Sequence, residues 1–134
     1  GEMENRFESM LLEVAQALPR VTTLMDGVET MHERGPMGGT SYWLNMLGCS
    51  TSPVAMDTAA FSLLPVEPDQ VLTWREARAR ELPGAFLQDL AFPLESPHAF
   101  DGSGFQVPGQ LSRVTFPLVR LMRGSFKRIW RRLR

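Results

Sequence analysis

Residues 24–57 read LMDGVETMHERGPMGGTSYWLNMLGCSTSPVAMD and form the most informative part of the chain. The β-branched segment 20–25 predicts a short strand that ends at Asp26. Residues 27–40 contain four glycines and one proline, which predicts a long loop. Residues 42–47 form an apolar run that is typical of a second strand buried on both faces, with a short helix as the alternative.

Helices are predicted on both sides of this stretch. Ser52 followed by Pro53 is a typical helix start, so we expect a helix over 53–64, and a further helix from Pro68 to Pro83. Residues 4–18 repeat apolar side chains every three or four positions, which predicts a helix with one buried face made of Phe7, Met10, Leu11, Val14 and Leu18. Residues 85–110 lack a sustained period, with short strand pairing at 87–94 as one interpretation. The predicted fold class is α/β, a small sheet of mixed strands with helices packed on it.

The composition indicates one compact domain and excludes several protein classes. The chain has 134 residues, of which 43% are hydrophobic and 22% charged, as is usual for a globular domain. Cys49 is the single cysteine, so no internal disulfide forms, and no Cys/His cluster has the spacing of a metal site. No apolar run reaches the roughly 20 residues of a membrane span. We therefore expect a cytoplasmic location.

Charge divides the chain into two parts. Residues 1–112 contain six arginines and all 15 acidic residues, a net charge of −9, whereas residues 113–134 contain seven arginines and one lysine, a net charge of +8. We expect a single α/β domain over 1–112, and a basic amphipathic helix or linker over 113–134. The tail is compatible with packing against the acidic domain or with homo-oligomer formation through Phe126 and Trp130. Contact with an anionic membrane surface or with nucleic acid is the other interpretation.

Candidate ligand-binding residues gather around the glycine-rich loop. Asp26 lies where α/β proteins place ligand-contacting groups, or it forms an Asp-Gly turn that serves local N–H groups. Asp57 either complements the dipole of the first helical turn or faces Asp26 across the loop. Glycine amides and a guanidinium suit an anion, so the predicted ligand-binding residues are Asp26, Arg34, Gly35, Gly38, Gly39 and Asp57. The loop matches neither a P-loop nor the dinucleotide fingerprint.

Two histidines and the cysteine are further candidates. Because imidazole changes charge near neutral pH, His32 is either a general base or metal ligand, or an exposed loop residue. The candidate catalytic residues are thus Asp26, His32 and Asp57, and His98 is a weaker candidate. Cys49 is either a thiol activated by the following helix N-terminus or a small apolar residue at a strand end.

The same stretch resembles the conserved core of the family known as domain of unknown function 362. Members show a strand ending in Asp, a segment close to Gly-Met-Glu-Gly-Asn-Gly-Pro, more glycines, a second strand, and Asp-Pro-Val-Ala-Leu-Asp at a helix start. The matching positions in this chain are Asp26, Met31, Gly35, Pro36, Gly39, Pro53, Val54, Ala55 and Asp57. By the order of its elements, the resemblance extends roughly over residues 7–105.

Four positions depart from the family pattern. His32 stands at the usual glutamate, Glu33 at a glycine, Arg34 at an asparagine, and Ser52 at the aspartate before proline. The family's layout implies that residues 1–112 are a fragment of a larger domain whose N-terminal half precedes them. It also implies a ferredoxin-like module with 4Fe-4S clusters beyond a basic linker similar to residues 114–134. No cofactor is expected within this chain.

Two functions follow from the sequence and the resemblance. The first is a binding or interaction domain of a redox-associated iron-sulfur protein, with the N-terminal half and the ferredoxin-like module as its partners. The alternative is an enzyme that acts on a small anionic substrate, or uses a divalent metal, at the site formed by Asp26, Asp57 and the glycine-rich loop.

Overall fold

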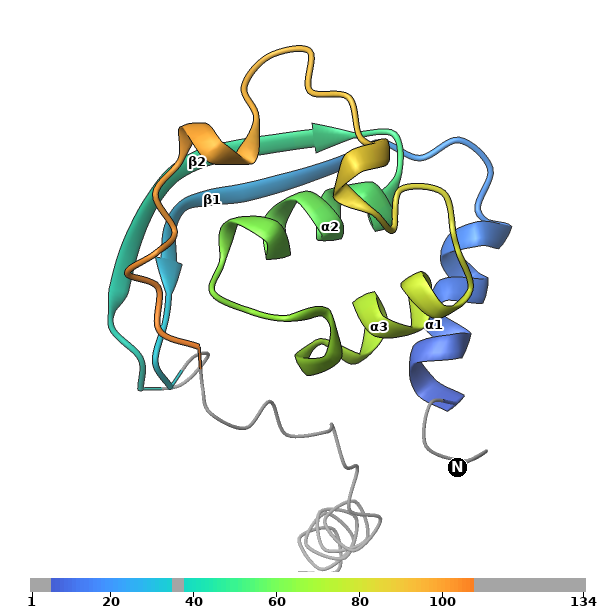
Figure 1. Ribbon diagram of the computed structural model, residues 1–134, viewed down its shortest axis with the longest axis horizontal. Coiled ribbons are helices and arrows are strands. Elements are labelled where there is room, and N and C mark those ends of the chain that lie inside the picture. The colour runs from blue at the N-terminus through green and yellow to red at the C-terminus, as the bar shows by residue number, and fades with distance from the viewer. Residues whose placement is uncertain (1–5, 35–37, 108–134) are drawn as a thin grey trace, which may run out of the picture.

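The computed structural model describes residues 6–34 and 38–107, and its elements form two layers (Figure 1). One layer consists of helix α1 (Arg6–Ala17) and a hairpin of strands β1 (Thr23–Met31) and β2 (Ser41–Ser50). Helices α2 (Pro53–Leu63) and α3 (Leu72–Ala79) form the other layer. Short 3-10 turns are η1 (Pro68–Gln70), η2 (Leu87–Asp89) and η3 (Pro97–Ala99). The predicted α/β class is confirmed.

The two strands pair antiparallel and are longer than the sequence predicts. Gly27 to Met31 belong to β1, so the predicted loop begins only after Met31, and Asp26 lies inside the strand rather than at its end. The register shifts between Gly27 and Glu29, and Asn45 on the opposite strand has a φ of 54°. Such a bulge bends a strand pair, and Figure 1 shows the hairpin curving around the helices.

Only one face of the hairpin is covered. A Cβ atom at Gly48 would lie 2.8 Å from Sδ of Met56 on α2 and 3.1 Å from Cε of Met25, so these residues meet between sheet and helix. Glycine at this position lets α2 approach the strand closely. The prediction that residues 42–47 are buried on both faces is wrong, because exposed residues alternate along β2 with partly buried ones and with buried Leu44.

Helix α2 begins where the sequence predicts. Ser52 has extended backbone angles, its Oγ accepts a hydrogen bond from Ala55 N at 3.2 Å, and Pro53 is the first helical residue. Asp57 is the fifth residue of α2, beyond the first turn to which the sequence interpretation assigned it. The predicted helix from Pro68 to Pro83 divides into η1 and the shorter α3.

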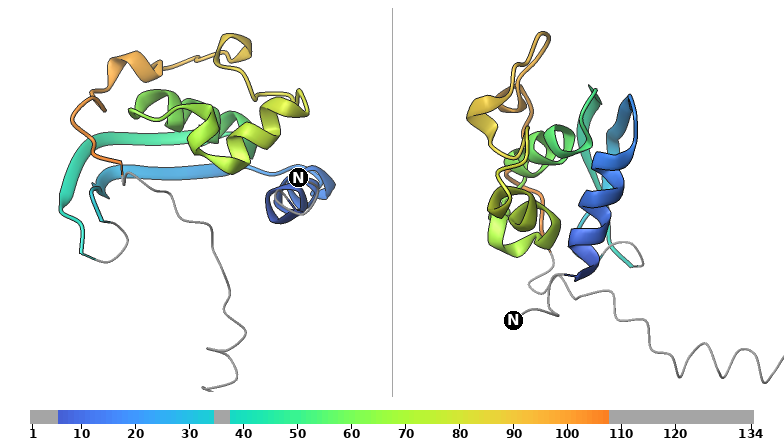
Figure 2. Two further views of the ribbon diagram at one scale, coloured as in Figure 1. Left: turned by 60° about the horizontal axis from the view of Figure 1, so that its bottom comes forward. Right: turned by 90° about the vertical axis from the view of Figure 1, so that its right-hand side faces the viewer.

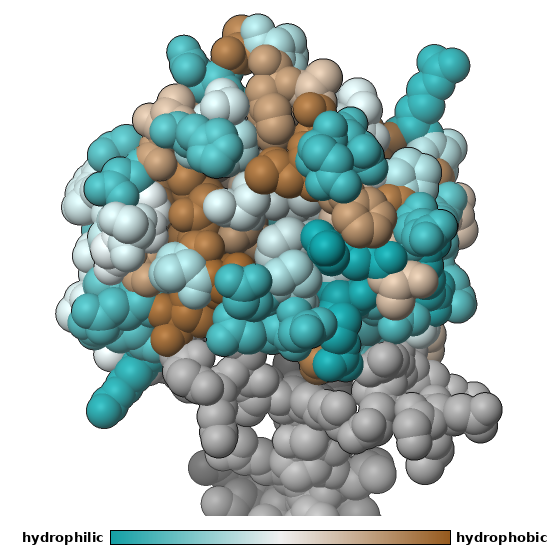
Figure 3. Space-filling model, viewed as in Figure 1, coloured by the Kyte–Doolittle hydropathy of each residue, from teal (hydrophilic) through white to brown (hydrophobic). Residues whose placement is uncertain are grey.

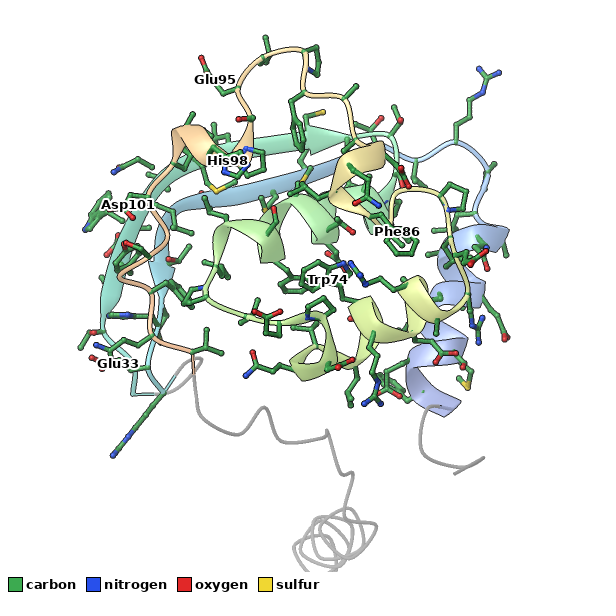
Figure 4. The ribbon with its side chains drawn as sticks, viewed as in Figure 1. Glu33, Trp74, Phe86, Glu95, His98 and Asp101 are labelled. Atoms are coloured by element: carbon green, nitrogen blue, oxygen red, sulfur yellow. The ribbon has the colours of Figure 1, made fainter. Side chains whose placement is uncertain are left out.

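The core lies between α2, α3 and the chain that follows α3. Indole Nε1 of Trp74 donates a hydrogen bond to the Ala85 carbonyl at 3.3 Å, and the Trp74 ring lies 5.6 Å from that of Phe61 (Figure 4). The Arg78 guanidinium lies over both the Trp74 and Phe86 rings, at 5.9 and 4.7 Å from their centroids. A cluster of buried residues continues this core: Leu12, Ala77, Leu82 and Ala85.

Helix α1 packs through the face opposite to the predicted one. Leu12 is only 7% exposed, and Ser9 Oγ donates a 2.9 Å hydrogen bond to Oε1 of Glu76 on α3. Arg80, just after α3, lies 3.7 Å from a carboxylate oxygen of Glu13. At 100° per residue the predicted apolar stripe lies on the other side of the helix. All five of its members are exposed: Phe7, Met10, Leu11, Val14 and Leu18.

The chain after α3 is mostly irregular and returns to the hairpin. Residues 87–94 contain η2 and no strand, so the strand interpretation of this segment is wrong. A Cβ atom at Gly102 would clash with the Leu63 carbonyl at the end of α2, which explains the glycine at this crossing. The predicted helix or linker over 113–134 lies outside the described residues.

Candidate interaction surface

A broad apolar surface, here named the outer layer, is the main candidate site. It consists of the hairpin face turned away from α2 and the face of α1 turned away from α3. In the right view of Figure 2, α2 and α3 lie on one side of the hairpin and α1 lies level with it. Both faces therefore look away from the core, in the same general direction.

The hairpin contributes large exposed side chains to the outer layer. Leu24 and Leu47 are 77% and 74% exposed, and Trp43 is also exposed. Residues paired across the strands project to one face, and here Leu24 pairs with Cys49 while Asp26 pairs with Leu47. Val28 and Met31 are exposed as well. The α1 stripe adds further exposed apolar side chains to the outer layer.

Asp26 lies within this apolar face. Its Oδ1 accepts a hydrogen bond from Val28 N at 3.0 Å, which is the local role that the turn interpretation foresaw, although the residue sits in a strand. Leu24 and Val28 flank it along β1, and Leu47 is its cross-strand neighbour. A carboxylate is thus exposed among apolar side chains.

Asp57 does not join Asp26. Met25, the residue before Asp26, faces α2, so Asp26 projects to the opposite side of the sheet from the helix that carries Asp57. The predicted convergence of the two carboxylates across the loop is therefore wrong. Partial desolvation raises the pKa of the Asp57 carboxyl above its usual value even though its side chain reaches solvent.

His32 fastens the hairpin end to the returning chain. Its Nδ1 accepts a hydrogen bond from Gln106 N at 3.2 Å, so the neutral ring carries its proton on Nε2, which lies 2.8 Å from Thr40 Oγ1. The rings of Tyr42 and Phe105 lie 5.3 and 5.6 Å from the imidazole. The side chain of His32 is 11% exposed. In this arrangement it joins the hairpin to the returning chain, whereas the sequence predicted a general base, a metal ligand or an exposed loop residue.

The remaining candidates do not gather around a common point. Arg34 and His98 are exposed on separate segments, and Gly35 lies outside the described residues. Gly38 has a φ of 96° and open space around it. Over residues 6–34 and 38–107, no three His, Cys, Asp or Glu side chains are placed to hold a metal ion. The proposed anion site of the loop thus stays a prediction.

Cys49 lies at the end of β2, on the outer layer, and is exposed. The strand-end position matches the second interpretation of this residue, but its burial as a small apolar residue does not. Since it is the single cysteine of the chain, it offers a chemical probe of the outer layer.

Sequence reasoning missed the outer layer itself. Trp43 and Leu47 were assigned to a buried strand and Leu24 to a short strand, and periodicity shows which residues share a face without showing what covers it. On the helix side of the molecule, hydrophobic residues gather in a band that hydrophilic residues border (Figure 3). No helix in the described part of the chain is long and apolar enough to cross a membrane.

Comparison with known proteins gives a family and one named relative. The thylakoid-associated protein sll1697 of Synechocystis sp. is 29% identical over 130 residues, which cover 97% of this chain and 40% of that protein. The chain therefore spans about two-fifths of the length of this relative. No solved structure matches. The sequence profile described as Domain of unknown function (DUF362) matches residues 1–62, so this segment of the chain is similar to that family.

Proposed function

We propose that the chain is a binding domain that contacts another polypeptide segment through the outer layer. The observation that carries this proposal is the orientation of α1, whose face with Ser9 and Leu12 meets α3 while its apolar stripe is exposed. An amphipathic helix gains most of its stability in a protein by burying its apolar face. A helix that packs the other way round has an apolar face available for a partner.

The hairpin supports the same function. An isolated two-stranded hairpin is marginally stable in water, and sheets normally gain stability from further strands or from packing on both faces. In the described residues, no backbone hydrogen bond joins β1 or β2 to a third strand. Covering the outer layer would bury Leu24, Trp43 and Leu47 together, each worth about 1.5–3 kcal/mol when fully buried.

Chemical footprinting tests this function. The rate at which a thiol reagent modifies Cys49 would be measured in native extract of the source organism and in the purified chain, with the Cys49 peptide followed by mass spectrometry. We expect several-fold slower modification in the extract, because a bound polypeptide would cover the outer layer. Equal rates in the two samples would contradict a binding function for this surface.

Association with an iron-sulfur protein is the finer part of the proposal. It is supported by the family resemblance alone, which implies a ferredoxin-like module outside this chain. The natural full-length gene product, purified without oxygen, should contain iron and acid-labile sulfide. Their absence would remove the redox part and leave the binding part intact. A cytoplasmic location belongs to the same proposal and is tested by cell fractionation.

Attachment to a membrane surface is a second candidate function. The printed name of the relative associates that protein with thylakoids, and residues 113–134 here have a net charge of +8. A basic amphipathic segment binds anionic lipid surfaces by charge and apolar contact. The intact chain should sediment with anionic vesicles at low salt, and a variant lacking residues 113–134 should not. No sedimentation of the intact chain would exclude this function.

A further inference from the structure

We infer that the guanidinium of Arg78 on α3, held against the rings of Trp74 and Phe86, is a binding site for a carboxylate. The carboxylate belongs either to a small organic acid or to an acidic side chain of another polypeptide. The site lies in the layer formed by α2 and α3. The inference therefore goes beyond the function proposed for the outer layer and does not depend on it.

Two aromatic rings hold Arg78 in place. Its guanidinium carbon lies 4.7 Å from the centroid of the Phe86 ring and 5.9 Å from that of the Trp74 ring (Figure 4). The chain after α3 fixes this arrangement, because Trp74 Nε1 donates a hydrogen bond to the Ala85 carbonyl and Ala85 N donates one to the Leu82 carbonyl. A surface arginine loses side-chain freedom when it binds a ligand. The rings already restrict Arg78, so this cost of binding is reduced.

The N–H groups of Arg78 have no partner in the described residues. A guanidinium carries five N–H donors. Over residues 6–34 and 38–107, no hydrogen bond or ion pair joins the Arg78 donors to an acceptor. The nearby Arg80 differs, because it lies 2.9 Å from a carboxylate oxygen of Glu76 and 3.7 Å from one of Glu13. Arg78 therefore keeps its donors for a ligand.

The other acidic residues of the chain are poorly placed to neutralise Arg78. The acids outside the described part are Glu2 and Glu4, which directly precede α1. Helix α1 meets α3 at Glu76, and at 100° per residue Arg78 lies about 200° around α3 from Glu76. Residues 113–134 contain no acid. The carboxylate is therefore expected to come from outside this chain.

The charge of the chain favours a carboxylate over a phosphate. A carboxylate has one negative charge and accepts two parallel hydrogen bonds from the fork of a guanidinium. Residues 1–112 have a net charge of −9, which opposes the second charge of a phosphate. Phe86 is only partly buried, so its ring offers an apolar contact to the body of the acid. An aromatic acid such as benzoate combines both features.

The test uses the natural full-length gene product that contains this chain. Phenylglyoxal, a reagent that modifies arginine, would be applied with and without about 20 mM benzoate, and the rate at each arginine would be followed by mass spectrometry. We expect Arg78 to react at least about threefold more slowly with benzoate present, as for a weak single ion pair. Benzamide, the neutral counterpart, should not protect Arg78. The exposed Arg20 is the internal control and should react at one rate throughout.

Two peptides with blocked termini test the second source of the carboxylate. One contains a single glutamate between two phenylalanines, and the other has glutamine in its place, so they differ in the carboxylate alone. Protection of Arg78 by the glutamate peptide and not by benzoate would assign the site to a polypeptide partner. Protection by benzoate and not by the peptide would assign it to a small acid. Inorganic phosphate at the same concentration should protect less than the better carboxylate probe.

Variants separate recognition from a structural role. Arg78→Gln should abolish binding of the protecting probe, benzoate or the glutamate peptide, in isothermal titration calorimetry. Arg78→Lys keeps the charge and loses the fork, so it should weaken this binding at least about threefold. Arg20→Gln should bind the probe as the parent does. The footprint of the parent requires no substitution, so it decides the question even where Arg78→Gln does not fold.

Three results would overturn the inference. Equal modification of Arg78 with and without both carboxylate probes would show that it binds neither. An Arg78 that stays unmodified without any probe would show that another part of the gene product already covers it. Stronger protection by phosphate than by either carboxylate would mean that the ligand class is wrong. None of these results changes the modification of Cys49, so they are distinct from a failure of the proposed function.

Discussion

The imidazole of His32 accepts a hydrogen bond from the backbone N–H of Gln106, which lies 74 residues further along the chain. This contact closes the molecule at the hairpin end, where Tyr42 Oη also donates to the Asp101 carbonyl at 3.1 Å. Glu33 N donates to the Gln106 carbonyl at 2.8 Å and completes the connection. Residues 101–107 are thus attached to the hairpin by side chain and backbone together.

Replacement of His32 should loosen this attachment. His32→Ala removes the acceptor of Gln106 N and the ring contacts with Tyr42 and Phe105, and we expect a loss of about 2 kcal/mol in the free energy of unfolding. Hydrogen exchange of the Gln106 amide should accelerate more than that of the core. His98→Ala, at an exposed histidine, is the control. Unchanged exchange at Gln106 would contradict an attachment of this residue through His32.

The serine before Pro53 should be replaceable by the aspartate of the family pattern. Both side chains can accept a hydrogen bond from the first helical turn, and the observed acceptor is Ser52 Oγ. Ser52→Ala should lower the free energy of unfolding by about 1 kcal/mol, and Ser52→Asp should leave it within about 0.5 kcal/mol. Urea denaturation measures both. A costly Ser52→Asp would mean that the hydroxyl has a role besides capping.

Thr58 is completely buried in α2, and its hydroxyl has no hydrogen-bond partner within the described residues. Thr58→Val keeps the shape and removes the unsatisfied group, so it should raise the free energy of unfolding by about 1 kcal/mol. Thr58→Ser keeps the hydroxyl and removes a buried methyl, so it should lower that free energy by about 1 kcal/mol. Thermal melts of the three proteins compare them. Equal melting points would contradict the assigned burial.

Asp57 should make stability rise in acid. Its pKa is raised in the folded chain by desolvation, so the ionised form destabilises the fold at every pH above the folded pKa. This penalty disappears as pH falls through the folded pKa towards the unfolded value of 3.8. Asp57→Asn should therefore be more stable than the parent at pH 7 and equally stable near pH 3, as measured by urea denaturation. The control is Glu95→Gln, which removes a carboxylate at an exposed loop position.

Local signals in the sequence predicted part of the fold. The start of α2 follows from Ser52 and Pro53, because capping depends on neighbouring residues alone. The existence of both strands was also predicted, but their lengths were not. Gly27 suggested a loop, yet a bulge accommodates it within β1.

The candidate site was harder to predict because it depends on distant contacts. The apolar stripe of α1 is present as predicted, but packing with α3 through Ser9, Leu12 and Glu13 decides that this stripe is exposed. The partner of His32 lies at Gln106, and no local pattern indicates it. Asp26 and Asp57 were placed together from their order in the chain, whereas strand alternation separates them across the sheet.

The attachment of α1 through one buried leucine and a few polar contacts makes this helix easy to detach. Segments with few buried apolar contacts open at a lower free energy than the core does. A ligand that binds only the docked helix would shift this equilibrium by mass action, in proportion to the logarithm of its concentration. The fraction of molecules in which α1 is docked would then rise with the fraction that has a partner bound. The order of α1 would therefore measure binding.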